Sequence, residues 1–398
     1  MPQQTTDSIL TSLSGCDVGY KEILTRLVSF DTTSRLSNLP LIDFVRGYLC
    51  GHGIESQIFL DESGQKASLH ALIGPCQEGG IGLSGHTDVV PVSGQNWTVE
   101  PFKLTARDGR LYGRATTDMK GFLACVLANV PHFKRLDLKK PLHILFSYDE
   151  EVGCTGVRPM ISRMGKDFPK PGIVIVGEPT NLNVVDAHKG PGLWRLTITG
   201  RSAHSSMPAL GVNAITFTGL IMNEIAKLSG ELEERSRDER FDPPYSSLQI
   251  TTIKGGSATN IVPARCELAF NVRAVPGFDI LQVEERLRQF ILEKCLPQMR
   301  KIASEADIDL VLTNQVPAFD VPKKSPAVSL ALAIRGQKDT FAVSYATEAS
   351  LFEEAGASSV VCGPGNIAQA HTKDEWIEES ELDRCMLFLK RLADHACV

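Results

Sequence analysis

Two kinds of hydrophobic pattern follow each other along the chain. Apolar residues at helical spacing predict helices over residues 19–30 and 38–51. Short, nearly all-apolar runs predict strands buried on both faces, as in a parallel sheet covered by helices. The predicted strands are residues 55–60, 68–74, 81–85, 142–148, 173–177 and 359–362, and the further helices are 118–133, 325–334 and 380–395. This alternation is typical of an α/β domain.

The middle of the chain has a different pattern. Its predicted strands alternate apolar and polar residues and are therefore one-faced: 193–199, 247–253, 266–272 and 308–313, with helices over 212–228 and 279–296. The order strand–helix–strand–strand–helix–strand is that of a ferredoxin-like α+β unit. We therefore predict a larger, discontinuous domain made of residues 1–189 and 316–398, with a smaller domain of residues 190–315 inserted into it.

Ligand-type side chains follow the predicted buried strands. Glu150 and Glu151 come after strand 142–148, and His86 and Glu178 stand at the ends of two others. Adjacent carboxylates repel each other unless a cation or a shared proton holds them. Open α/β sheets carry their sites at the carboxyl ends of the strands. The pattern predicts a cluster of His, Asp and Glu at one edge of the sheet.

Composition excludes several classes of function. The 398 residues carry a net charge of −6, and no Lys/Arg cluster resembles a nucleic-acid footprint, so we expect no nucleic-acid partner. No apolar stretch approaches the roughly 18 residues that a membrane span needs, and the first residues do not resemble a signal peptide. The ten cysteines include no C-x-x-C, which favours reduced thiols in a cytoplasmic protein.

Six ordered motifs resemble the M20 family of metallopeptidases and deacylases. They are Ser84-Gly-His-Thr-Asp-Val-Val-Pro, Gly113-Arg-Ala-Thr-Thr-Asp-Met-Lys-Gly, Asp149-Glu-Glu-Val-Gly, Gly177-Glu-Pro-Thr, Ser202-Ala-His-Ser-Ser and His371-Thr372. The resemblance covers nearly the whole chain. It implies a two-domain di-metal amidohydrolase, usually a homodimer, with a mixed-sheet catalytic domain and an inserted lid or dimerisation domain. One position departs from the pattern, because Ala115 stands where the family usually has glycine.

The resemblance also implies the metal ligands. Asp118 would bridge two divalent ions, zinc or cobalt, with His86 and Glu178 on one ion and Glu151 and His371 on the other. Histidine and carboxylate without cysteine suit catalytic rather than structural zinc. Each of these residues alone is more typical of a hydrogen-bonded loop, and only the ordered set favours ligands.

Two more residues near these ligands receive roles from the resemblance. Glu150 would be the general acid and base, since Glu151 is occupied by a metal. Asp88 would orient the imidazole of His86; a simple turn-forming role is its alternative. The family also implies a cis peptide between Asp118 and Met119.

The inserted domain is expected to add substrate contacts. His204 resembles the histidine that stabilises the oxyanion in the neighbouring subunit's site, and Asn260 and Arg273 match positions that hold the substrate carboxylate. For Arg273 a surface ion pair is the alternative. Gly365 is expected to let the backbone approach the substrate, unless it simply makes a turn.

The segment around Thr347, Glu348 and Ala349 bears on the substrate. It resembles the form found in family members that hydrolyse N2-acetyl-L-ornithine for arginine synthesis, and it lacks the arginine that a succinyl carboxylate requires. Glu348 is the candidate partner of the ornithine side-chain ammonium; a surface glutamate is the alternative. Deacylation of another N-acyl amino acid, such as acetylcitrulline or succinyl-diaminopimelate, and a catalytically silent dimeric binding protein remain open.

Overall fold

The computed structural model describes residues 18–398, which form two compact units. The first unit contains the described residues up to Asp186, then Val321–Phe341 and Thr347–Val398. The second contains Ala187–Asp320 and Ala342–Ala346. Residues 187–189, 316–320 and 342–346 were predicted in the larger domain but belong to the second unit. Within that unit the backbone N–H of Lys189 donates to the Val343 carbonyl, and the Ser344 hydroxyl donates to the Asp242 carbonyl.

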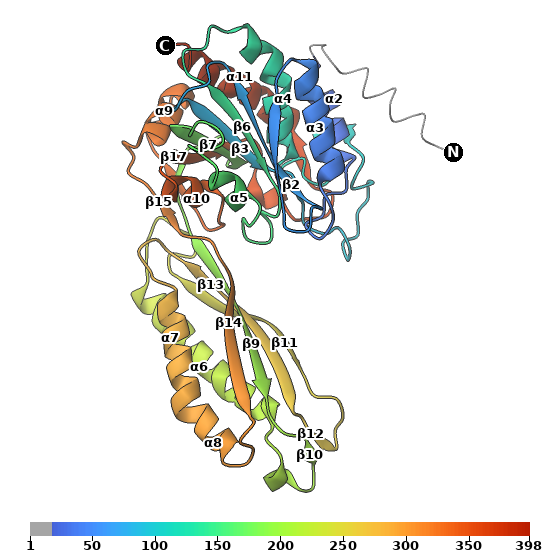
Figure 1. The fold of residues 1–398 in the computed structure, drawn as a ribbon, viewed down its shortest axis with the longest axis vertical. Helices are drawn as coiled ribbons and strands as arrows, with labels where there is room; N and C mark the ends of the chain where they lie inside the picture. The colour runs from blue at the N-terminus through green and yellow to red at the C-terminus, as the bar shows by residue number, and fades with distance from the viewer. Residues whose placement is uncertain (1–17) are drawn as a thin grey trace, which may run out of the picture. The chain divides into compact units, whose positions relative to one another are not determined.

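The first unit is built on a mixed sheet (Figure 1). Its strand order is β1 (Ser56–Leu60), β2 (Ala67–Ile73), β6 (Leu142–Ser147), β3 (Ile81–His86), β7 (Ile173–Pro179), β17 (Ser358–Gly363) and β8 (Val185–His188). The four strands β6, β3, β7 and β17 are parallel, and β1, β2 and β8 run antiparallel to their neighbours. Short strands β15 (Phe319–Asp320) and β16 (Phe341–Val343) pair with β8 where the chain passes between the units.

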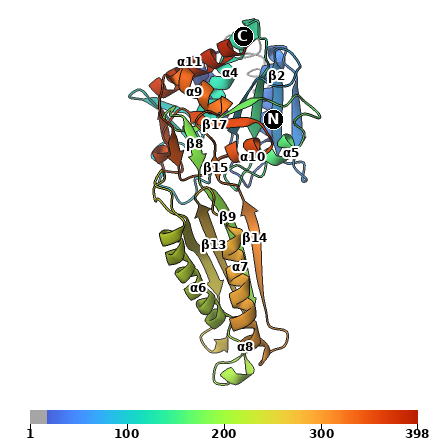
Figure 2. The ribbon, with the colours of Figure 1, turned by 90° about the vertical axis from the view of Figure 1, so that its left-hand side faces the viewer.

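Helices cover both faces of this sheet (Figures 1 and 2). One face carries α2 (Tyr20–Val28), α3 (Leu39–Gly51), α4 (Lys120–Arg135), α9 (Pro326–Arg335) and α11 (Glu379–His395). The other carries the short α5 (Val157–Ile161) and α10 (Ala349–Glu354). Strands β3 and β6 are therefore buried along their whole length, as their mostly apolar sequences predict.

A small second sheet in this unit joins distant parts of the chain. Strand β18 (Trp376–Glu378) pairs with β5 (Arg110–Tyr112), which pairs with β4 (Thr105–Arg107). This pairing brings the segment after His371 beside the loop that leads to Asp118.

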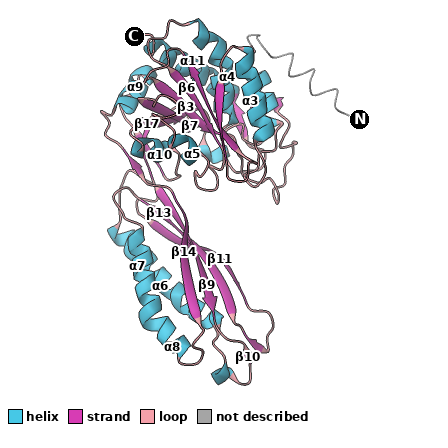
Figure 3. Cartoon of the chain, in the orientation of Figure 1, coloured by secondary structure: helices cyan, strands magenta, loops and turns pink. Residues whose placement is uncertain are grey.

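The second unit is a four-stranded antiparallel sheet with helices on one face (Figure 3). In chain order its elements are β9 (Gly190–Thr199), α6 (Ala214–Arg235), β11 (Ser247–Gly255), β13 (Arg265–Ala274), α7 (Leu281–Phe290), a π-helical turn (Ile291–Cys295), α8 (Leu296–Arg300) and β14 (Asp307–Gln315). The strand order β11-β13-β9-β14 is ferredoxin-like, and Trp194, Leu196 and Ile198 of β9 face the helices. Two-residue strands β10 (Ala203–His204) and β12 (Ile261–Val262) pair separately.

Element boundaries depart from the predictions in three places. The helix predicted over 212–228 runs on to Arg235, and the one predicted over 279–296 is two helices joined by the π-helical turn. The helix predicted to begin at Asp118 begins at Lys120, after a cis peptide between Asp118 and Met119. Among residues 18–398, no helix has the length and hydropathy to cross a bilayer.

Candidate metal site

The carboxyl edge of the parallel strands collects the predicted ligands. His86 is the last residue of β3, Glu178 lies near the end of β7, and Glu150 and Glu151 follow β6. Gly177 makes this packing possible, because a Cβ there would lie 2.2 Å from the Phe122 ring on α4. The sheet edge therefore holds these side chains on rigid strands.

Asp118 lies between two histidine–glutamate pairs. Its Oδ1 is 3.1 Å from His86 Nε2, which is itself 3.7 Å from Glu178 Oε1. Its Oδ2 is 3.2 Å from His371 Nε2, which is 3.0 Å from Glu151 Oε1. Each carboxylate oxygen of Asp118 thus faces a different pair, which is the arrangement that a carboxylate bridging two cations requires.

The pKa values of the clustered side chains show that the charged forms of the carboxyl groups are disfavoured. Burial raises the pKa of Glu150 and of Glu178 well above the usual value. Burial and the neighbouring Asp118 raise the pKa of Glu151 to about 7, and hydrogen bonds to Asp118 and Glu151 raise the pKa of His371 to about 10. Buried carboxylates this close together need positive charge to stay ionised.

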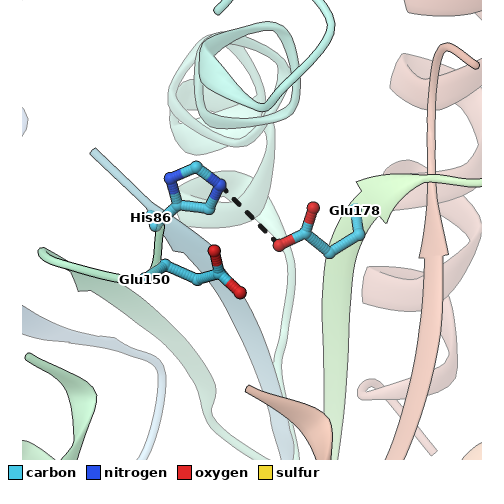
Figure 4. Close-up of side chains that lie close together, drawn as sticks. All are labelled: His86, Glu150 and Glu178. Atoms are coloured by element: carbon cyan, nitrogen blue, oxygen red, sulfur yellow. Dashed lines mark ion pairs between the residues drawn. The ribbon is translucent and has the colours of Figure 1, made fainter. Parts of the chain in front are cut away.

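The donor set fits two divalent cations. Glu178 Oε1 is buried with no hydrogen-bond partner. The ligand atoms of His86, Glu150 and Glu178 (Figure 4) lie within 4.8 Å of one another, and so do those of His86, Asp118 and Glu151. Imidazole and carboxylate without thiolate is the donor chemistry of catalytic zinc, and imidazole also suits other late transition ions. Asp118, His86, Glu178, Glu151 and His371 are the residues that could hold such ions.

Asp88 connects the His86 side to the pair of glutamates. His86 Nδ1 lies 2.9 Å from the Asp88 carbonyl oxygen and 3.4 Å from its carboxylate, which leaves Nε2 facing Asp118. The Asp88 carboxylate also accepts the backbone N–H groups of Glu150 and Glu151 at 3.1 and 3.3 Å. Burial alone would raise the pKa of Asp88, but its bond to His86 and these donors hold it below the usual value. Asp88 therefore orients the imidazole mainly through its backbone, and its side chain fixes the two glutamates.

Glu150 points into the same space as His86 and Glu178 (Figure 4) but is not one of the pairs around Asp118. Its Oε1 accepts a hydrogen bond from the Cys154 thiol at 3.3 Å. Burial also raises the pKa of Cys154, so the thiol stays a donor. A half-buried carboxyl with a raised pKa beside the predicted ligands is suited to carry a proton.

Of the other predicted residues, Glu348 borders this cluster, because its charge raises the pKa of Glu150 and the His86 imidazole acts to lower that of Glu348. His204 and Asn260 lie together in the second unit, where Ser205 N–H donates to the Asn260 carbonyl at 3.0 Å, and Arg273 lies near the end of β13. Glu348 and Gly365 belong to the first unit. The substrate roles of all five stay predictions.

The structure bears on the alternatives left open for Glu348 and Gly365. Glu348 is not a surface residue: it is 1 % exposed, accepts the Ser84 hydroxyl at 3.2 Å, and burial raises its pKa to about 7. Gly365 adopts φ +84°, its N–H donates to Glu381 and its carbonyl accepts from Asn181, so its backbone groups have protein partners.

Sequence reasoning missed several supporting residues. Ser34 donates to the Asp88 carboxylate at 2.8 Å, and Lys66 pairs with Asp149 at 2.6 Å, directly before Glu150. Cys154 stands four residues after Glu150, and Glu375 stands four residues after His371. This closeness to predicted site residues was the only signal in the sequence that they support the site. Ser34 and Lys66 have no such signal.

An α/β sheet with a histidine–carboxylate cluster at its carboxyl edge is the arrangement of a metal-dependent hydrolase. Residues 82–395 match the model of peptidase family M20/M25/M40, and the chain belongs to this family.

Full-length relatives and solved structures agree with this assignment. The chain is 36% identical over 382 residues to the acetylornithine deacetylase of Myxococcus xanthus, covering 94% of this chain and 96% of the relative. It is 34% identical over 370 residues to that of Pasteurella multocida (strain Pm70), covering 93% and 94%. The fold is shared with the di-peptidase Dug1p of Saccharomyces cerevisiae (TM-score 0.72, 15% identity, 99% and 98% covered). It is also shared with the M20 family metallo-carboxypeptidase Sso-CP2 of Sulfolobus solfataricus (TM-score 0.71, 18% identity, 95% and 99% covered).

Proposed function

We propose that this protein hydrolyses N2-acetyl-L-ornithine to L-ornithine and acetate, as a step of arginine synthesis. The observation that carries the proposal is Glu150, a half-buried carboxyl with a raised pKa that lies beside the predicted ligands and is not needed in either pair around Asp118. Two relatives that match more than nine tenths of the chain are acetylornithine deacetylases, which supports this substrate over others.

The proposed cofactors are two divalent ions, zinc or cobalt. His86 and Glu178 would hold one ion, Glu151 and His371 the other, and Asp118 both. When bound, such ions polarise the amide carbonyl and make the attacking water more acidic.

Glu150 then carries the proton. It takes a proton from the water that attacks the acetyl carbonyl, and it gives that proton to the α-nitrogen as the C–N bond breaks. Ornithine leaves as the amine and the acetyl group leaves as acetate. Asp88 keeps Glu150 in place through the Glu150 backbone N–H.

The remaining predicted residues have roles in binding. We propose that His204 stabilises the oxyanion, that Asn260 and Arg273 bind the substrate carboxylate, and that the backbone at Gly365 borders the substrate. Glu348 is proposed for the side-chain ammonium, a charge that a buried carboxylate would compensate well.

The second unit is proposed to serve as lid and dimer interface in a cytoplasmic homodimer. Its surface carries exposed apolar side chains, among them Leu210, Ile215, Ile253 and Ile261, of a kind that interfaces cover. The nine described cysteines are free thiols, which suits a reducing compartment.

Steady-state hydrolysis by metal-loaded protein tests the proposal, with acetylornithine, acetylcitrulline, acetylmethionine, acetylglutamate and succinyl-diaminopimelate as substrates. We expect the highest kcat/KM for acetylornithine and no turnover by Glu150→Ala. Glu348→Gln should lower the preference for acetylornithine over acetylalanine; an unchanged preference removes Glu348 from the substrate site. A higher kcat/KM for another acyl amino acid would keep the chemistry and change the substrate. No turnover with metal bound would favour a binding protein.

A further inference from the structure

The Glu375 carboxylate accepts hydrogen bonds from the loop that ends at Asp118. The residue directly precedes β18 and is fully buried. Its Oε1 accepts the backbone N–H groups of Thr117 and Asp118 at 3.0 and 3.1 Å. Its Oε2 accepts the N–H of Ala115 at 3.0 Å and the Arg114 guanidinium at 2.8 Å. One carboxylate therefore fixes four donors in the five residues that end at Asp118.

Arg114 extends this network to the segment that carries His371. Its guanidinium donates to the Thr372 carbonyl at 3.3 Å and to Gln95 Oε1 at 2.5 Å, and it lies 4.9 Å from the centre of the Trp97 ring. The Gln95 amide in turn donates to the His371 carbonyl at 2.7 Å. The backbone of His371, in a left-handed conformation with φ +59°, is thus held from outside its own turn.

We propose that Glu375 is a positioning residue for the metal site, and that the Glu375–Arg114–Gln95 network sets the separation of Asp118 and His371. This inference rests on the proposed two-ion site, and it identifies the residues that hold the ligands of that site in position. Asp118 and His371 come from distant parts of the chain, and His371 is half exposed, so neither is placed by core packing alone. Hydrogen bonds from supporting residues hold ligands in geometry, and their loss weakens metal binding 10–100-fold.

The network predicts that substitutions of Glu375 and of Gln95 weaken metal binding to different extents. Glu375 supports the Asp118 loop, and Asp118 faces both pairs, so Glu375→Gln should weaken binding of both ions. The substituted amide would present N–H donors to groups that are themselves donors. Gln95 contacts the His371 backbone and the Arg114 side chain, so Gln95→Ala should chiefly weaken one ion.

Calorimetric titration of apo-protein with Zn²⁺ tests this, alongside the melting temperature of each apo-protein. Glu378→Gln is the matched control, because Glu378 lies three residues further along, pairs with Arg110 at 2.9 Å and does not contact the loop. We expect at least 10-fold weaker binding at both sites for Glu375→Gln, about 10-fold at one site for Gln95→Ala, and wild-type binding for the control.

Unchanged zinc affinity in Glu375→Gln, with only a lower melting temperature, would overturn the proposal and leave a purely structural ion pair. If that variant does not fold, Gln95→Ala decides, and unchanged affinity there overturns it equally. Zinc binding is measured without substrate, so the outcome is separate from the proposed function. A wild-type protein that binds two ions but does not hydrolyse acetylornithine would refute only the substrate assignment, whereas one that binds none would refute both.

Discussion

Two histidines with predicted roles, His86 and His204, lie in contrasting regions of the molecule. His86, at the sheet edge of the first unit, is 1 % exposed, and its ring nitrogens face Asp88 and Asp118. His204, on β10 of the second unit, is exposed, and Ser206 supplies its ring contacts through its hydroxyl at 2.7 Å and its backbone N–H. In the first region, hydrogen bonds within the protein hold the His86 ring in place without a ligand. The ring of His204, by contrast, contacts a residue only two positions away, so its predicted role depends on a partner or substrate that reaches it.

The largest effect in the first region is expected from substitutions of the adjacent glutamates, Glu150 and Glu151. Glu150→Gln should lower kcat about 10³-fold, within the range for general acid–base catalysis, and leave metal content unchanged. Glu151→Gln is the control, because it should lose metal as well as activity. Loss of metal from Glu150→Gln would make Glu150 a ligand, as its place beside His86 and Glu178 allows. The measurements are kcat and metal content per chain.

The same test in the second region is His204→Ala. If His204 stabilises the oxyanion, kcat should fall about 10²- to 10³-fold with metal content and melting temperature unchanged. Ser206→Ala removes the local hydroxyl partner and should change kcat only a few-fold. Wild-type kinetics for His204→Ala would show that the exposed histidine has no part in the reaction.

Substitution of Asp88 tests how much the hydrogen bonds around the sheet-edge site contribute to its zinc affinity. Asp88→Asn replaces an acceptor of two backbone N–H groups, so we expect 10- to 100-fold weaker zinc affinity, measured by competition with a chelating dye. Asp61→Asn is the control, because Asp61 accepts only from its own turn. Equal affinities for the two variants would contradict the role of Asp88.

A pair of histidines away from the site gives the first unit a pH dependence. His70 Nε2 and His143 Nδ1 lie 3.1 Å apart, and burial lowers their pKa values to about 3 and about 4. The unfolded chain, with a histidine pKa of about 6.5, binds these protons first, so stability falls as pH drops from 6.5 towards 4. The loss should be about 2 kcal/mol per histidine between pH 6.5 and 5.

Chemical denaturation at the two pH values measures this effect. The double variant His70→Phe with His143→Leu should lose most of the difference. An equally steep acid loss in the variant would place the titrating groups elsewhere.

The smallest expected effect concerns Ala115, where the family usually has glycine. Ala115 has φ +67°, a conformation that costs an L-residue about 1–2 kcal/mol, while glycine has a larger unfolded-state entropy. Ala115→Gly should therefore raise the free energy of unfolding by about 0.5 kcal/mol, against a loss of about 1 kcal/mol for Ala128→Gly inside α4. If Ala115→Gly lowers the free energy of unfolding, as Ala128→Gly does, the left-handed conformation at Ala115 costs little. The contacts with Glu375 would then have offset its cost.

The sequence by itself determined the elements and the chemistry of the sheet edge. Nearly all-apolar runs such as 142–148 predict strands buried on both faces, and parallel strands end at a common edge, so the sequence predicted that His86, Glu151 and Glu178 lie close together. The order of elements in residues 190–315 likewise predicted a ferredoxin-like sheet. Short elements such as β18 escaped prediction, because three residues carry too little periodicity.

Only the tertiary structure decided how the site is held. Burial of Glu348 depends on contacts with distant residues such as Ser84, and the convergence of Glu375 and Arg114 accompanies the pairing of β18 with β5, two strands far apart in the sequence. No local pattern encodes such a pairing, because its hydrogen bonds form only when the whole unit packs. The ligands follow from strand order, and the contacts that position them follow from long-range packing.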